Sequence, residues 1–69
     1  MKLKFLDDEW EEFMSHCGFT DDEKEIVHYL RKGWYGMDIA FELNISRSTF
    51  KRRKKDIEER ITKYILKTG

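Results

Sequence analysis

The sequence predicts an all-α fold, a small bundle of four to five helices that ends in a long C-terminal helix. Proline is absent from the 69 residues. Strand-like alternation is weak, whereas Glu, Lys, Arg, Leu and Ile, which lose little on entering a helix, are abundant. A chain of this length has room for one compact core, so residues 1–69 are expected to form a single domain.

The first expected helix covers about residues 7–17 and is acidic. Asp7 or Asp8 can cap its start, and Gly18 can end it in a left-handed conformation. One face of this helix is apolar and carries Trp10, Phe13, Met14 and Cys17.

The second helix is expected from about Asp21 to Lys32. Thr20 and Glu23 have the spacing of a capping box, in which each side chain accepts a backbone N–H of the other residue. Gly33 ends this helix. Trp34 and Tyr35 follow in a short connection, where covering the end of the core is favoured over exposure to a partner.

The third helix is expected over residues 37–43, with Ile39, Ala40 and Leu43 facing inward. Asn44-Ile45 forms a turn, and Ser46 is a suitable N-cap for a fourth helix. That helix runs from Arg47 to about Lys67, because no glycine or proline interrupts it.

The C-terminal extension, residues 57–67, has a broad apolar stripe. It packs either on the first helix or on another copy of the chain, and a homodimer is slightly favoured. The candidate dimer or partner surface consists of Ile57, Ile61, Tyr64 and Ile65.

Residues 47–55 hold six basic side chains and no acid, directly after the turn. A helix, a tight turn and a basic second helix predict a helix-turn-helix whose second helix can enter the major groove of DNA. Residues near the start of such a helix usually meet base edges, which selects Arg47, Ser48, Lys51 and Arg52. Thr49, Lys54 and Lys55 are expected to meet phosphates.

The formal net charge is zero, but the charges are separated along the chain. Residues 1–25 hold nine acids and three lysines, a charge of −6, and residues 26–69 hold eleven bases and five acids, a charge of +6. The acidic first helix could rest against the basic fourth helix or face a protein partner such as RNA polymerase.

Other classes of function have little support in the sequence. His16, Cys17 and His28 are too few for a structural zinc site, and no catalytic constellation or nucleotide fingerprint is present, so we expect neither metal, cofactor nor enzyme activity. A single cysteine and the lack of a long apolar run predict a cytoplasmic protein without membrane contact.

A longer pattern of residues resembles a LuxR/GerE-type DNA-binding domain, over about residues 20–61. The resemblance implies that the third helix braces the DNA backbone, the fourth reads bases, and dimers bind paired half-sites. Tyr35-Gly36 stands where that family has a polar cap, and the glycine break after the recognition helix is absent. The pattern consists of Phe19-Thr20-Asp21-Asp22-Glu23-Lys24-Glu25-Ile26-Val27, Gly33, Ile39-Ala40, Leu43, Ile45-Ser46, Thr49-Phe50-Lys51 and Ile57.

The same pattern is similar to the promoter-reading C-terminal domain of bacterial sigma factors. The expected function is therefore a sequence-specific, double-stranded DNA-binding regulator of transcription. The alternative is a sigma-like module that contacts the transcription machinery rather than DNA.

Overall fold

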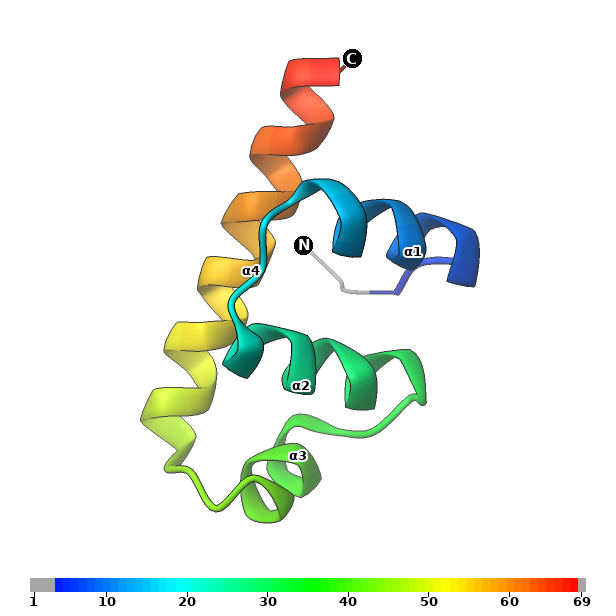
Figure 1. The fold of residues 1–69 in the computed structure, drawn as a ribbon. Coiled ribbons are helices and arrows are strands. Elements are labelled where there is room, and N and C mark those ends of the chain that lie inside the picture. Colours follow the sequence, from blue (N-terminus) through cyan, green and yellow to red (C-terminus); the bar gives the residue numbers. More distant parts are fainter. Residues whose placement is uncertain (1–3, 69) are drawn as a thin grey trace.

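The computed structural model describes residues 4–68, which form four helices and no strand (Figure 1). These are α1 (Asp7–His16), α2 (Asp21–Arg31), α3 (Gly36–Glu42) and α4 (Arg47–Thr68). The all-α prediction is confirmed. The extension over residues 57–67 belongs to α4 itself, so the described residues contain no separate fifth helix.

The starts of the first two helices are fixed by glutamates in their first turns. Thr20 and Glu23 form the expected capping box, with Thr20 N–H donating to Glu23 Oε1 at 2.8 Å and Glu23 N–H donating to Thr20 Oγ1 at 3.2 Å. The cap of α1 differs from the prediction of Asp7 or Asp8. Leu6 is the N-cap, and its N–H donates to Glu9 Oε1 at 2.9 Å. A leucine offers no acceptor, so α1 has only half of the reciprocal arrangement.

Two glycines end α1 and α2. Gly18 and Gly33 have φ of 65° and 82°, in the left-handed region that glycine adopts without a steric penalty. After α2 the chain turns through a Schellman motif, in which Trp34 N–H donates to Tyr29 O at 3.1 Å.

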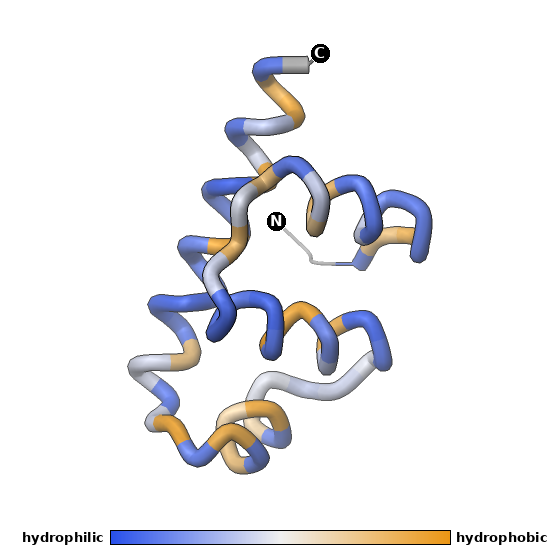
Figure 2. Tube along the Cα trace, in the orientation of Figure 1, coloured by the Kyte–Doolittle hydropathy of each residue, from blue (hydrophilic) through white to orange (hydrophobic). Residues whose placement is uncertain are grey.

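α4 is the longest helix, and α1, α2 and α3 pack against it at successive levels along its length (Figure 1). α1 lies beside the C-terminal half of α4, α2 beside the middle, and α3 beside the N-terminal end. Hydropathy along the trace fits this arrangement, since α4 is mainly hydrophilic with isolated apolar positions, whereas α3 is largely apolar (Figure 2).

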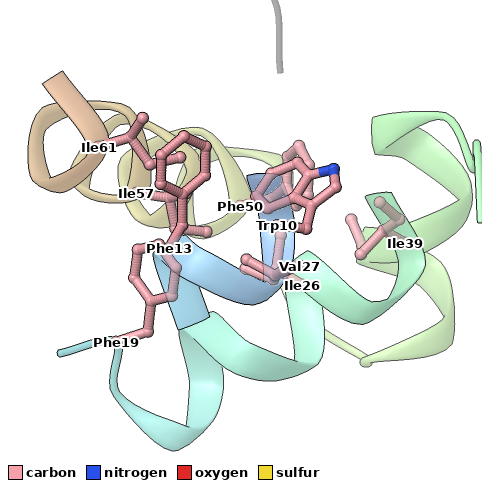
Figure 3. Packing of buried hydrophobic residues seen from close by; sticks show 10 residues of the cluster. Trp10, Phe13, Phe19, Ile26, Val27, Ile39, Phe50, Ile57 and Ile61 are labelled. Carbon is pink, nitrogen blue, oxygen red and sulfur yellow. The ribbon is translucent and has the colours of Figure 1, made fainter. Parts of the chain in front are cut away.

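The core lies between these helices and draws residues from all four (Figure 3). Phe13 and Trp10 pack edge-to-face with ring centroids 6.1 Å apart. Half-buried side chains, among them Phe5 and Tyr64, close the edges of the core. Its buried members are Trp10, Phe13, Phe19, Ile26, Val27, Ile39, Ala40, Phe50, Ile57 and Ile61.

Candidate nucleic-acid interface

The candidate interface begins at the turn between α3 and α4. Asn44 adopts a left-handed conformation with φ of 55°, and Ile45 N–H donates to Ala40 O at 3.0 Å. Asparagine tolerates this backbone region better than most residues, and the hydrogen bond completes a Schellman end to α3. The turn therefore directs the chain sharply from α3 into α4.

Ser46 caps α4 as expected. Its hydroxyl oxygen accepts the N–H of Thr49 at 3.1 Å, and its hydroxyl proton is donated to Thr49 Oγ1 at 2.9 Å. The Thr49 hydroxyl thus acts as an acceptor within the cap and still has its own proton to donate.

α4 presents its first turns to solvent. Phe50, in the core, marks the inner face of the helix. Five of the seven predicted DNA contacts are exposed and two are half-buried. The exposed residues are Arg47, Ser48, Lys51, Arg52 and Lys55, and the half-buried ones are Thr49 and Lys54.

Ion pairs divide the cations of the chain into two groups. Within residues 4–68, three arginines have acidic partners: Arg31 with Glu11 at 3.0 Å, Arg53 with Asp22, and Arg60 with the buried Glu23. Apart from Arg53, the cations of residues 47–55 form no ion pair within the described residues. They are Arg47, Lys51, Arg52, Lys54 and Lys55. Since these side chains are unpaired, their positive charge remains available to a ligand.

Arg53 is the exception within the basic run. Its guanidinium lies 3.6 Å from Asp22 Oδ2 in the first turn of α2, and its side chain is half-buried. Arg53 therefore joins α4 to α2, while its basic neighbours face outward.

A notch of about 550 Å³ opens between the start of α3 and the start of α4. Gly36 makes this junction tight, because a Cβ atom there would lie 2.8 Å from Cε2 of Phe50. Met37 and Ala40 add apolar lining, and the rim carries cations. These are Arg47, Lys51 and Lys54, with Tyr35 and the carboxylate of Asp38 also on the lining.

The outer face of α3 and the residue before it are unusually apolar. Tyr35, Met37 and Phe41 are 80%, 69% and 87% exposed. The prediction that Trp34 and Tyr35 cover the core is wrong for Tyr35. Trp34 is partly exposed and packs on Tyr29, with ring centroids 4.5 Å apart. Sequence spacing gave no signal for this patch, since tyrosine and tryptophan beside glycine suit core and surface alike.

The predicted dimer or partner surface must be corrected. Ile57 and Ile61 have no exposed surface, because α1 and α2 cover them, so they cannot meet another copy. Tyr64 is half-buried and stacks on the His16 ring at 5.7 Å. Ile65 and Leu66 are exposed near the C-terminal end of α4.

The acidic first helix does not lie against residues 47–55. α2 separates α1 from that end of α4 (Figure 1). Asp7 and Glu11 instead approach Arg31 of α2, at 3.7 and 3.0 Å. The two charged ends of the molecule are therefore held apart.

The residues considered as metal ligands are scattered. His16 stacks on Tyr64, and His28 lies edge-on to Tyr29 on another helix. Burial raises the pKa of the Cys17 thiol, and the positive charge of Arg60 opposes that rise. Among residues 4–68, no three His, Cys, Asp or Glu side chains are grouped to hold a metal ion.

In the part of the chain that the structure describes, no helix has the length and apolar character needed to cross a membrane. Comparison with protein-family models, curated proteins and solved structures finds no match for this chain.

Proposed function

We propose that this protein binds double-stranded DNA in a sequence-specific manner and regulates transcription. In this proposal α3, the turn and α4 act as a helix-turn-helix, and the first turns of α4 enter the major groove. The observation that carries the proposal is the difference between the cations that form ion pairs and those that do not. The arginines that hold the fold together have acidic partners, whereas five cations at one end of α4 are unpaired.

The positions of these cations give them different roles. Arg47 and Arg52 are exposed at the start of α4, where an arginine can bind O6 and N7 of guanine together. Such a pair contributes about 1–3 kcal/mol of discrimination. Lys55 lies further along the helix and Lys54 is half-buried beside α3, positions suited to phosphate contacts that add affinity without reading sequence.

The test is selection of binding sites from a random duplex pool, at low and at high salt, followed by sequencing. The wild type is compared with Arg47→Ala/Arg52→Ala, and with Lys24→Ala/Lys63→Ala as a control that removes the same charge elsewhere. We expect one enriched motif for the wild type and the control, lost in the first variant. Binding should weaken steeply with salt, with a log–log slope of about −0.9 for each neutralised phosphate.

Failure of the wild type to enrich any motif at low salt would contradict the proposal. Equal loss of binding in both variants would show that only total charge matters, which contradicts sequence-specific reading. Circular dichroism of each variant would verify that the helices are intact.

A second candidate function is supported by the apolar face of α3. Tyr35, Met37 and Phe41 form an exposed patch of the kind that marks protein interaction sites. In this alternative the chain is a sigma-like module that contacts the transcription machinery. Association through this patch would change little with salt, and Phe41→Ser would abolish it while leaving DNA binding intact.

A further inference from the structure

The notch between α3 and α4 has a chemical character that restricts its ligand. Its floor is apolar, formed by Ala40 and Phe50, and Met37 extends this lining. Its rim carries the cations Arg47, Lys51 and Lys54 and the carboxylate of Asp38, so the lining is positive on balance. A matching ligand presents an apolar group surrounded by negative charge.

The start of α1 has that character. Leu6 is 74% exposed and is followed directly by Asp7 and Asp8. Apart from Leu6, the exposed large apolar residues that the structure describes lie at residues 34–41 or near the end of α4. Leu6 is thus the exposed apolar side chain that stands within the acidic region.

The two surfaces cannot meet within one molecule. α1 lies at the level of the C-terminal half of α4, and α2 stands between α1 and the starts of α3 and α4 (Figure 1), whose residues line the notch. The molecule is 35 Å long, and α1 lies away from the starts of α3 and α4, which line the notch. Contact between them therefore requires a second copy.

We propose that the α3–α4 notch of one molecule binds the acidic start of α1 from a second copy. Leu6 occupies the apolar floor and Asp8 faces the cations of the rim, with Asp7, which lies 3.7 Å from Arg31 of its own molecule, beside it. The contact joins two different surfaces, so each added copy leaves one notch and one α1 unoccupied, and assembly continues unless it closes into a ring. A contact this small is weak and, because it depends on exposed charges, sensitive to salt.

The contact has a regulatory consequence that rests on the proposed function. Arg47, Lys51 and Lys54 line the notch and are also predicted DNA contacts. A copy whose notch holds α1 of its neighbour cannot place these side chains on DNA. Self-association off DNA therefore competes with DNA binding, and DNA dissolves the assemblies.

The experiment measures self-association of the full chain by sedimentation velocity without DNA, at low and at high salt. One variant, Leu6→Ser/Asp8→Lys, disables the start of α1. Serine is a good N-cap, so this change keeps the start of α1 stable. The other variant disables the notch, Lys51→Glu/Lys54→Glu. Two controls make similar charge changes elsewhere, at exposed positions: Glu25→Lys, and Lys24→Glu/Lys63→Glu.

We expect the wild type and both controls to associate in a concentration-dependent manner at low salt. Each disabled variant alone should be monomeric, with a dissociation constant raised about tenfold or more. The two disabled variants mixed together should form a 1:1 heterodimer and nothing larger, because one retains an intact notch and the other an intact α1.

A monomeric wild type at low salt would overturn the inference. So would association that persists in either disabled variant, or a mixture that stays monomeric. Because these measurements contain no DNA, they are separate from the proposed function. A heterodimer together with a wild type that binds no duplex would uphold the contact and remove its regulatory role.

Discussion

The two halves of α4 differ in what surrounds them, although they belong to one uninterrupted helix. Residues 47–55 hold six bases and no acid, and five of these bases are unpaired. Residues 56–67 hold three acids and three bases, and two isoleucines of this half are fully buried. The C-terminal half is therefore fixed by isoleucines buried in the core, whereas the N-terminal half exposes most of its basic side chains to solvent.

The largest expected effect concerns the buried half. Ile61→Ala removes a fully buried side chain that packs in the core with residues of α1 and α2, and should lower the free energy of unfolding by about 2–5 kcal/mol. Ile65→Ala, one turn later and 42% exposed, should cost far less. Denaturant unfolding followed by circular dichroism measures both. Equal costs would mean that the C-terminal half is not anchored as described.

A smaller effect is expected at the link between α2 and α4. Glu23 is buried, accepts the N–H of Thr20 and lies 3.2 Å from the Nε atom of Arg60. Glu23→Gln keeps an oxygen for the cap but removes the charge that faces Arg60. We expect the free energy of unfolding to fall by about 1–2 kcal/mol. This is low for the loss of a charged hydrogen bond, because the Arg60 side chain is partly exposed and can be solvated instead.

Asp22→Asn is the matched comparison for Glu23→Gln. Asp22 pairs with Arg53 at 3.6 Å but is largely exposed, so its neutralisation should cost under about 1 kcal/mol. A larger loss for Asp22→Asn than for Glu23→Gln would show that α4 is fixed mainly through its basic half, which would reverse the contrast between the halves.

The smallest effect is kinetic. Burial beside α4 raises the pKa of the Cys17 thiol, and the thiolate is the reactive form. Cys17 should therefore react with a disulfide reagent more slowly than free cysteine at the same pH, and faster as the pH rises. Because the folded state holds this proton more tightly, stability falls slightly once the pH exceeds the pKa of the unfolded thiol. A reaction as fast as that of free cysteine would mean that α4 does not cover this side chain.

Features set by neighbouring residues were predictable from the sequence. Thr20 and Glu23 are three residues apart, so the capping box follows from spacing alone. Gly33 and Ser46 end and begin helices through local backbone geometry. The inner face of α4 followed from helical periodicity, since Phe50 and Ile57 recur at helical intervals and are buried.

Features that depend on distant residues were not predictable. Glu23 and Arg60 are 37 residues apart, and nothing local indicates that a capping glutamate also binds an arginine of α4. The notch depends on Gly36 meeting Phe50 across two helices. Periodicity identified an apolar stripe on α4, but only the position of α1 and α2 decides that Ile57 is covered. The sequence-specific reading of DNA remains a prediction.

The continuity of α4 has a mechanical consequence. A helix of 22 residues without glycine or proline behaves as a stiff rod about 33 Å long, with no hinge between its two ends. A tilt of the molecule by about 10° about Ile65 would carry Arg47 sideways by about 5 Å, close to the ~6 Å width of a minor groove. Because α4 is also fixed in the core by Ile57 and Ile61, a partner bound near Ile65 would orient the whole molecule and therefore the position of Arg47.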